Sequence, residues 1–357
     1  SALTSAQVND IYNGGVPAAI SPSPVSWWRM GESTLDGFGT HAGADYALIT
    51  DEVTPTLGSE VLSDTSFDNN GAWTYTGAGA GETFDVQTTN AGKLTAIAAQ
   101  DCKLYQNGSP MVDGQVYLLE LEVDTYTAGN LRGVTDTQTW NVPIAGTGTF
   151  KHYFRASGTV FDILVDGPAT FTATSISLKP VNGNAGLAIN TPTFSRSVPA
   201  EDATWNNRSI LFNGADEYMT TTADDTLATK SYSFWAKSDD TAANEVFDHG
   251  ARNQGCFIFN LNAGRAIHYL NEGYFRYWVD NSAQDDDAWH HHVVYIEHDD
   301  ITNCKWYVDG VAQTASETNS SAGSALAYTT GLRIGVGGTS EFDGSLDEFA
   351  VFDGELT

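Results

Sequence analysis

The feature that most constrains the fold of this chain is a succession of short β-type segments from residue 209 onward. Each segment is rich in Val, Ile, Tyr, Phe and Trp, and Gly, Asn or Asp separates it from the next. Short apolar or alternating runs with such boundaries predict strands of a two-sheet sandwich. The clearest segments are residues 209–214, 231–235, 289–295, 306–310 and 332–335. We therefore expect an all-β protein, and sandwiches of this kind usually bind or build rather than catalyse.

The order of these segments resembles the laminin-G-like, or concanavalin-A-like, jelly roll. Four motifs carry the resemblance: a tryptophan followed by histidine and valine at residues 289–294, Tyr-Val-Asp-Gly at 307–310, Arg-Ile-Gly at 333–335, and Gly-Ser-Leu-Asp-Glu at 344–348. The last of these looks like the closing strand of the family. The resemblance covers residue 24 to about residue 53 and residues 182–357. It implies glycan or protein binding, with structural calcium.

A different pattern interrupts this domain, since residues 48–53 should run directly into residues 182–187. The intervening segment has β-type runs of its own, of which residues 115–123 alternate well from Val116 onward. Loop tips tolerate such insertions because their ends are exposed and close together. The insert is similar to the carbohydrate-binding-module-like jelly rolls that recur in phage tail proteins, with an opening run at 60–67, an early Trp73 and a final strand at 176–178.

We therefore predict two antiparallel β-sandwich (jelly-roll) domains, one inserted in the other, plus a short N-terminal helix. A chain of 357 residues is long enough for two domains with cores of their own. The predicted parts are residues 1–23, the N-terminal helix and linker; residues 24–56 and 181–357, a discontinuous laminin-G-like jelly roll; and residues 57–180, the inserted carbohydrate-binding-module-like β-sandwich.

The predicted helix begins with a capping box at Thr4 and Gln7, and Val8, Ile11 and Tyr12 fall on one of its faces. A helix this short is not stable alone, so it must dock on other structure. It is similar to the segment that follows the closing strand of laminin-G-like domains. It is either the remnant of a preceding domain in a tandem polypeptide or an element that docks onto a neighbouring copy. Both explanations imply a chain that works in series.

The charge of the chain limits its partners. Asp and Glu number 45 against 16 Lys and Arg, which gives a net charge of −29. Such a surface repels a phosphate backbone, so we exclude nucleic acid as a partner. Divalent cations are natural partners, although a role in solubility explains the same surplus of acids. No apolar run approaches the roughly 18 residues that a membrane span needs.

Calcium prefers six to eight hard oxygen ligands. Asn213 and Asp216 follow one predicted strand, Asp347 lies on the closing strand, and the resemblance implies that these strands are neighbours. We therefore predict Asn213, Asp216 and Asp347 as candidate calcium ligands. The alternative is that they are turn and edge residues without a metal.

Aromatic side chains suggest where a glycan could stack. Tyr274, Arg276 and Trp278 share one face of a predicted strand, and Trp73 and Trp140 are similar candidates in the insert. The alternative for all five is a place in a core or on a sheet surface. The His-His-His run at residues 290–292 puts two imidazoles on one face and one on the other. A hydrogen-bonded structural role is favoured over zinc binding there.

The sequence contains no nucleophile elbow, phosphate-binding glycine loop or zinc-protease helix. Paired carboxylates suited to glycoside hydrolysis are the remaining catalytic alternative. We predict a non-enzymatic structural or adhesive protein at the virion surface or outside the cell, most similar to phage capsid fibres, decoration proteins or tail fibres. It would act as a homo-oligomer that binds host-surface glycan or neighbouring virion proteins. The alternatives are a bacterial extracellular adhesin or filament subunit, and the binding portion of a secreted carbohydrate-active enzyme.

Overall fold

A computed structural model gives the fold of the chain over most of its length. The described residues are 24–30, 46–49, 51, 56–68, 72–76, 83–87, 91–96, 102–106, 108, 110–134, 139–142, 146–156, 158–190, 192–199, 208–221, 230–242, 244–249, 256–259, 265–271, 274–279, 286–297, 301–315, 317–319, 332–336 and 341–354. The predicted N-terminal helix falls outside these residues.

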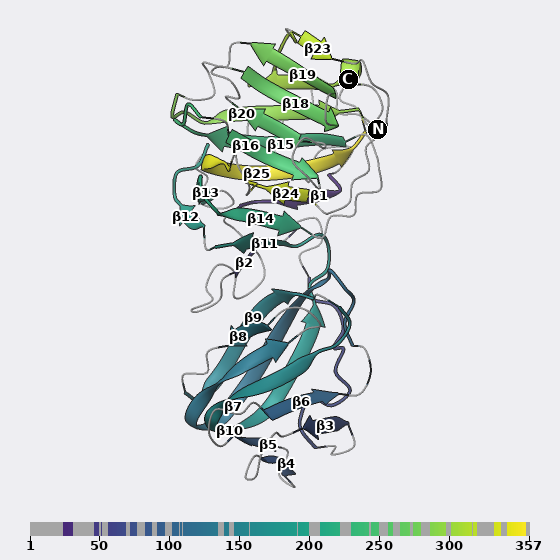
Figure 1. The fold of residues 1–357 in the computed structure, drawn as a ribbon, viewed down its shortest axis with the longest axis vertical. Helices are drawn as coiled ribbons and strands as arrows, with labels where there is room; N and C mark the ends of the chain where they lie inside the picture. The colour runs from purple at the N-terminus through teal and green to yellow at the C-terminus, as the bar shows by residue number, and fades with distance from the viewer. Residues whose placement is uncertain are drawn as a thin grey trace. The chain divides into compact units, whose positions relative to one another are not determined.

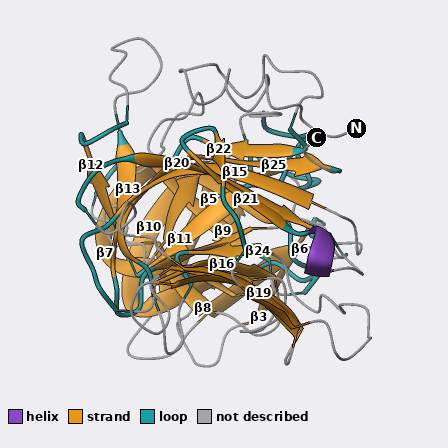
Figure 2. Ribbon diagram, turned by 90° about the horizontal axis from the view of Figure 1, so that it is seen from above, coloured by secondary structure: helices purple, strands orange, loops and turns teal. Residues whose placement is uncertain are grey.

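Strands dominate the described part of the chain (Figure 2). Its only helical element is the short 3-10 helix η2 (Ile301–Asn303). The strands form several antiparallel sheets, so the prediction of an all-β fold is confirmed.

The chain divides into two compact units. Unit 1 comprises Ser1–Gly39, Leu48–Pro55 and Gly183–Thr357, and unit 2 comprises Thr40–Ala47 and Thr56–Asn182. Compactness does not by itself show that a unit folds alone, so the domain limits given above stay a prediction.

Unit 1 contains two sheets (Figure 1). The eight-stranded sheet has the order β12 (Thr193–Ser195), β13 (Ser209–Asn213), β25 (Asp343–Asp353), β15 (Lys230–Lys237), β20 (His290–Ile296), β21 (Lys305–Val308) and β22 (Val311–Ala312), with β1 (Ser26–Trp28) on β25. The nine-stranded sheet has the order β2 (Tyr46–Ile49), β11 (Gly186–Ile189), β14 (Tyr218–Thr221), β24 (Leu332–Ile334), β16 (Asn244–His249), β17 (Cys256–Phe259), β18 (Arg265–Asn271), β19 (Tyr274–Val279) and β23 (Glu317–Asn319).

Aromatic side chains join the two sheets of unit 1 into a sandwich. Phe247 of β16 packs against Tyr232 of β15, with ring centroids 4.4 Å apart, and against Phe349 of β25 at 5.7 Å. All three side chains are inaccessible to water or nearly so. Burial of rings of this size supplies much of the stability of such a core.

Two of the sequence motifs in unit 1 make turns. Asp309 and Gly310 have φ of 49° and 77° and form the two-residue loop between β21 and β22. Positive φ at both positions is what the favoured hairpin turn requires, and Asp-Gly meets that need. Gly335, which ends the Arg-Ile-Gly run, has φ of 70° and donates its amide to the Val246 carbonyl.

Unit 2 has one eight-stranded antiparallel sheet system. One path runs β3 (Trp73–Thr76), β6 (Cys102–Gln106), β10 (Asp162–Pro180), β5 (Ala91–Ala96) and β4 (Thr83–Gln87). The long strand β7 (Val116–Val134) pairs with β10, β8 (Thr139–Val142) and β9 (Gly148–Arg155).

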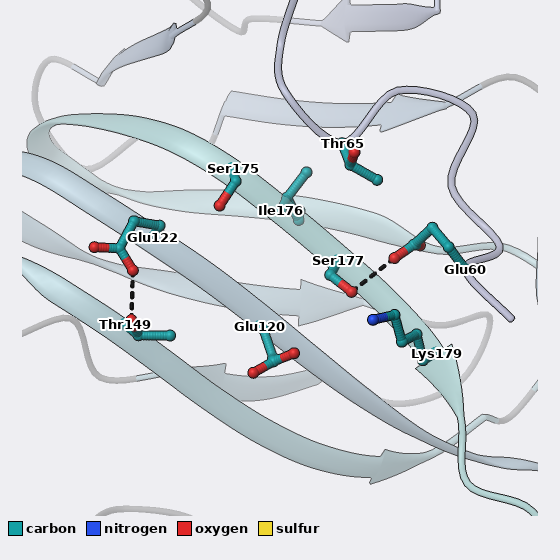
Figure 3. A pocket seen from close by; sticks show the side chains of 9 residues that line it. All are labelled: Glu60, Thr65, Glu120, Glu122, Thr149, Ser175, Ile176, Ser177 and Lys179. Atoms are coloured by element: carbon teal, nitrogen blue, oxygen red, sulfur yellow. Dashed lines mark hydrogen bonds between the residues drawn. The ribbon is translucent and has the colours of Figure 1, made fainter. Parts of the chain in front are cut away.

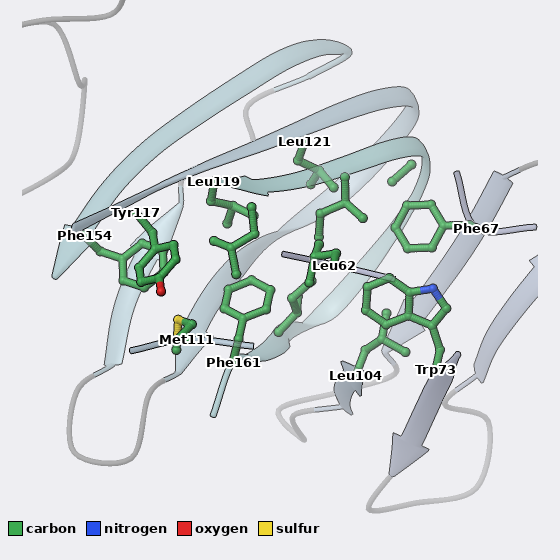
Figure 4. Close-up of a cluster of buried hydrophobic side chains, with 14 of the residues drawn as sticks. Leu62, Phe67, Trp73, Leu104, Met111, Tyr117, Leu119, Leu121, Phe154 and Phe161 are labelled. Carbon is green, nitrogen blue, oxygen red and sulfur yellow. The ribbon is translucent and has the colours of Figure 1, made fainter. Parts of the chain in front are cut away.

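Alternation along β7 builds the core of unit 2 (Figure 4). Tyr117, Leu119 and Leu121 are at most 2% exposed and belong to one buried cluster with Phe154 and Phe161. Because strand residues alternate between faces, Glu120 and Glu122 must stand on the opposite face. This alternation places the carboxylates of the candidate site.

Two of the points at which the chain passes from one unit to the other, after Pro55 and after Asn182, are close together. In unit 1 the Asp51 carboxylate accepts the amides of Trp27 at 3.0 Å and Asn184 at 3.1 Å. In unit 2 the Asn182 amide donates to the Thr56 carbonyl at 2.9 Å. Both ends of the segment of residues 56–182 are therefore held close together, as an insertion into a loop requires.

Candidate binding site

Unit 2 has a hollow of about 440 Å³ over strands β7, β9 and β10 (Figure 3). It lies on the sheet face that points away from the apolar core. We call it the polar hollow. Its lining residues are Glu60, Thr65, Glu120, Glu122, Thr149, Ser175, Ile176, Ser177 and Lys179.

Strand register brings the polar side chains together from distant parts of the sequence. Glu120 lies opposite Ser177, and Glu122 lies opposite Ser175 and, on its other side, Thr149. Residues directly opposite in antiparallel strands share a face and stand about 5 Å apart. The floor of the hollow therefore consists of carboxylates flanked by hydroxyls on rigid strands.

Glu60 forms one wall and is fixed by the backbone. Its Oε1 accepts the amides of Val61 at 3.0 Å, Leu62 at 3.0 Å and Leu178 at 2.9 Å. Its Oε2 accepts the Ser177 hydroxyl at 2.6 Å. Four donors hold the carboxylate in one orientation, so Glu60 is a structural residue as well as a lining residue.

The other charged side chains of the polar hollow have hydrogen-bonding positions available for a ligand. The Glu120 carboxylate pairs with Lys151 at 3.1 Å, and Glu122 accepts the Thr149 hydroxyl. A carboxylate accepts about four hydrogen bonds, so each keeps acceptor sites for donors from solution. Lys179 makes no hydrogen bond or ion pair within the part of the chain that the structure describes. The arrangement can accept hydroxyl hydrogens on one side and donate to an oxygen on the other.

The predicted glycan platform at Trp73 is wrong. Trp73 is 7% exposed and stacks on Phe67 with ring centroids 5.2 Å apart. Its indole Nε1 donates to Asp64 Oδ2 at 2.9 Å, and the Asp64 Oδ1 accepts the Ser66 amide at 3.1 Å. The ring is a core residue with its polar edge satisfied, so it offers no face to a sugar.

The other predicted glycan residues lie on strands whose side chains are outside the described residues. Trp140 is in β8, opposite Gly133 of β7. Tyr274, Arg276 and Trp278 are in β19, which pairs with β18 and β23. All four lie in strands, and their role as a glycan platform stays a prediction.

The structure does not bring the three predicted calcium ligands together. Asn213 lies opposite Asp343 at one end of β25, whereas Asp347 is four residues further along that strand. Four residues of strand span about 13 Å. The Asn213 Oδ1 accepts the amides of Ala215 at 2.9 Å and Asp216 at 3.2 Å, which makes it the cap of a turn.

Asp347 has a local role instead. It is fully buried, and its Oδ1 accepts the Glu348 amide at 2.9 Å. Glu348 has φ of 50°, and the register between β15 and β25 shifts here, so Glu348 and Phe349 together oppose Phe234. This is a β-bulge, which re-aims side chains. The Asp-Glu pair of the closing strand therefore shapes the backbone.

Two acidic residues stand near Asn213: Asp216, whose Oδ1 accepts a hydrogen bond from Asn213 Nδ2 at 3.1 Å, and Asp343, which lies opposite Asn213 in the strand register. Burial raises the pKa of the Asp343 carboxyl, and the nearby Asp240 and Asp239 raise it further. No group of three or more His, Cys, Asp or Glu side chains suited to a metal occurs among the residues for which placement is described. Calcium binding thus stays a prediction, and the proposed set of Asn213, Asp216 and Asp347 does not fit one ion.

The three consecutive histidines are hydrogen-bonded within the sheet. His290 Nδ1 lies 2.7 Å from Asp309 Oδ2, and its Nε2 lies 3.2 Å from Asp286 Oδ1. His291 Nε2 lies 2.9 Å from the Ser233 hydroxyl on β15, and Trp306 Nε1 donates to His292 Nδ1 at 3.3 Å. These contacts support the structural role predicted for the run.

Sequence reasoning missed the polar hollow. The signal that could have found it is the Glu-x-Glu alternation at Glu120 and Glu122 within an apolar strand. Carboxylates at alternate positions mark a solvated sheet face. Only strand pairing shows that Thr149, Ser175 and Lys179 share that face.

Comparisons with known proteins concern unit 1 most directly. Residues 213–357 match the family model Laminin_G_3, described as the concanavalin A-like lectin/glucanases superfamily. The match covers less than half of the chain and lies wholly within unit 1. No curated protein matches the chain.

Several solved structures align with the chain. The CBM22-1-CBM22-2 tandem domain of Paenibacillus barcinonensis Xyn10C is 12% identical, with a TM-score of 0.28, and the alignment covers 83% of this chain and 98% of that one. Domains LG4-5 of the mouse laminin alpha1 chain are 10% identical, with a TM-score of 0.29 and coverages of 69% and 89%. The full extracellular region of zebrafish Gpr126/Adgrg6 is 11% identical, with a TM-score of 0.27 and coverages of 80% and 36%. At these identities and TM-scores no conclusion about this chain is drawn from the matches.

Across the described residues, no helix has the length and apolar character needed to cross a membrane.

Proposed function

We propose that this chain is a non-enzymatic binding protein whose polar hollow takes a hydroxyl-rich, uncharged glycan. One observation carries the proposal: three carboxylates, one ammonium and four hydroxyls line a space of about 440 Å³ on rigid strands. Pockets of this size hold small ligands. Sugar hydroxyls donate to carboxylates and accept from an ammonium, so the lining complements a sugar ring edge.

The side chains that line the polar hollow also limit which classes of glycan can bind there. None of its lining residues is aromatic, so recognition depends on hydrogen bonds rather than on ring stacking. The three carboxylates and the net charge of −29 disfavour uronates and other polyanions. The family matched by unit 1 includes lectins in its description, which supports a carbohydrate or protein ligand for that unit as well.

The biological setting belongs to the same proposal. We place the chain outside the cell or on a virion surface, as a repeated structural or adhesive component such as a capsid fibre, decoration protein or tail fibre. A bacterial adhesin or filament subunit is the rival setting, and a secreted carbohydrate-active enzyme is the third. Mass spectrometry of purified virions tests the first setting, and release of reducing sugar from a bound polysaccharide would favour the third.

Isothermal titration of the full chain against a panel of neutral oligosaccharides tests the ligand. For an oligosaccharide that binds, Lys179→Met and Glu122→Gln should each weaken binding about tenfold, because a hydrogen bond to a charged group contributes about 1.5 kcal/mol. Asp68→Asn changes an exposed acid outside the hollow and should leave the affinity unchanged. Absence of binding across the panel, or equal affinities in all variants, would reject the polar hollow as a glycan site.

A further inference from the structure

The hydroxyl groups of the polar hollow differ in the hydrogen bonds that they can make with a ligand. The Ser177 hydroxyl donates to Glu60 Oε2 at 2.6 Å, and the Thr149 hydroxyl donates to the Glu122 carboxylate. A serine or threonine hydroxyl has one hydrogen and two acceptor positions. Because the single hydrogen of each group is already bonded to a carboxylate, the oxygens of Ser177 and Thr149 can only accept hydrogen bonds from a ligand.

The carboxylates on the floor of the polar hollow are acceptors as well. Glu120 Oε1 lies 3.1 Å from the Lys151 ammonium, and Glu122 Oε2 accepts the Thr149 hydroxyl. A carboxylate accepts about four hydrogen bonds and donates none. Acceptor positions therefore remain on both carboxylates, and a ligand has to bring the hydrogens.

Strand register arranges these acceptors in two rows (Figure 3). Glu122 on β7 lies opposite Thr149 on β9, and Glu120 lies opposite Ser177 on β10. Each row thus pairs one carboxylate with one hydroxyl oxygen that can only accept. Glu120 and Glu122 are two residues apart on β7, so the rows are about 7 Å apart. A ligand that spans the polar hollow has to supply hydrogen-bond donors in both rows.

The wall of the polar hollow keeps the Ser177 hydroxyl in this orientation. The Glu60 carboxylate that accepts its hydrogen is itself fixed by three backbone amides. The segment of residues 60–65 is also bonded to β10, since the Ile176 amide donates to the Thr65 carbonyl at 2.9 Å. Turning the Ser177 hydroxyl toward a ligand would break a hydrogen bond to a carboxylate, and such bonds are stronger than those between neutral groups.

Groups that can only donate are fewer in the polar hollow. Lys179 has three hydrogens and no acceptor position. Thr65 and Ser175, the other two hydroxyls of the lining, can rotate either to donate or to accept. The lining therefore has more groups that only accept than groups that only donate, and a ligand that fits it must have the opposite balance.

The hydroxyl groups of an unsubstituted sugar meet this need, because each has a hydrogen to donate. When a hydroxyl is O-methylated or O-acetylated, the oxygen that remains can accept a hydrogen bond but cannot donate one. Placed on Glu120 or Glu122, such an oxygen would displace water and leave the carboxylate without a donor, which costs more for a charged group than for a neutral one. No aromatic side chain in the lining compensates by stacking.

Resting on the glycan binding proposed above, we propose that the polar hollow selects glycans whose hydroxyls are free along one edge and rejects glycans that are O-methylated or O-acetylated there. The groups that accept the hydroxyl hydrogens are Glu120, Glu122, Thr149 and Ser177. Lys179 donates to an oxygen of the same glycan. The substitution of the glycan, rather than its type of sugar ring alone, then decides whether it binds.

Isothermal titration of the full chain with matched oligosaccharides tests the proposal. The probes are the neutral oligosaccharides of the panel, each in a free form, an O-methylated form and a form in which fluorine replaces the hydroxyls. Fluorine is similar in size to a hydroxyl group but brings no hydrogen, so it separates the loss of donors from a steric clash. Both substituted forms should bind more weakly than the free form by about tenfold or more.

The outcomes distinguish this proposal from the glycan site on which it rests. Equal affinities of the free and fluorinated forms would overturn the selection for free hydroxyls, and the polar hollow would remain a glycan site if Lys179→Met weakened the binding of both forms. Absence of binding by every form would reject the site and the selection together.

Substitutions in the two rows locate the contact. In Glu122→Gln the side-chain carbonyl can still accept the Thr149 hydroxyl, but the new amide donates hydrogen bonds. The preference for the free over the fluorinated form should therefore shrink in Glu122→Gln and in Glu120→Gln, and it should be unchanged in Asp68→Asn. A preference that stays complete in both Gln variants would overturn the proposal, because other groups would then accept the hydroxyl hydrogens.

Discussion

At the scale of single residues, several motif positions of unit 1 serve the backbone rather than a ligand. Asn213 caps a turn, Asp347 accepts the amide of the bulge residue Glu348, and Asp309 both forms a hairpin and accepts the His291 amide at 2.9 Å. Polar residues with such local bonds are easily mistaken for metal ligands, because short carboxylates and amides suit both tasks.

A substitution at Gly335 tests whether a single backbone position affects the stability of unit 1. Its φ is 70°, and a Cβ there would lie 2.8 Å from the Phe212 ring. Gly335→Ala should therefore lower the free energy of unfolding of unit 1 by roughly 1–3 kcal/mol, through backbone strain and a clash in the core. Urea unfolding measures the change. Gly146→Ala is the matched control, because no atom lies within 4 Å of its Cβ, and equal stability of the two variants would contradict the argument.

At the scale of elements, the three histidines of β20 differ in the direction of their pKa shifts. Asp309 and Asp286 raise the pKa of His290, whereas burial lowers the pKa of His291 to about 3 and that of His292 well below its ordinary value. His292 also stacks on Phe234 and Trp306, with centroids 5.3 Å and 6.0 Å away. The strand therefore folds with two buried neutral imidazoles, that of His292 on the face toward the core and that of His291 on the opposite face. At its start Asp309 and Asp286 stabilise the protonated form of the His290 imidazole.

The pH dependence of unfolding follows from these shifts. His291 and His292 take up protons near pH 6.5 only when unfolded, so stability falls as pH drops below about 6.5, by up to 1.4 kcal/mol per unit for each residue. His290 acts in the opposite sense, since its raised pKa gives stability that is complete below its ordinary pKa and is lost as pH rises through the folded value. Urea unfolding at pH 7, 6 and 5 should show that the free energy of unfolding falls at low pH. In His291→Gln the slope of the free energy of unfolding against pH should be smaller by the contribution of one bound proton. An unchanged slope in that variant would contradict the assignment.

At the scale of the whole molecule, patterns among adjacent residues predicted the strands. The pairing of strands that are distant in the sequence determines which side chains form a site. Alternation in residues 116–123 and the Asp-Gly turn at 309–310 are properties of adjacent residues, so the sequence alone reveals them. The bulge at Glu348 is not visible in this way, and a shift of one residue exchanges the two faces of a strand. Trp73 shows the same limit, because its burial depends on Phe67 and Asp64 in a segment without regular structure. The polar hollow could not be predicted from the sequence, because its lining depends on the register of three strands.

The closeness of the crossings after Pro55 and after Asn182 allows a test of the predicted domain insertion. The Asp51 carboxylate holds Asn184, and Thr56 is bonded to Asn182, so removing residues 56–182 leaves two ends that a short linker can join. A chain that joins Pro55 to Gly183 through two glycines should fold, and residues 56–182 alone should fold and retain any glycan affinity of the full chain. Calorimetry should give two transitions in the full chain that match those of the separate parts. A control that removes residues 56–170 leaves the apolar end of β10 unpaired and should aggregate. Failure of either separate part to fold would refute the prediction that one domain is inserted in a loop of the other.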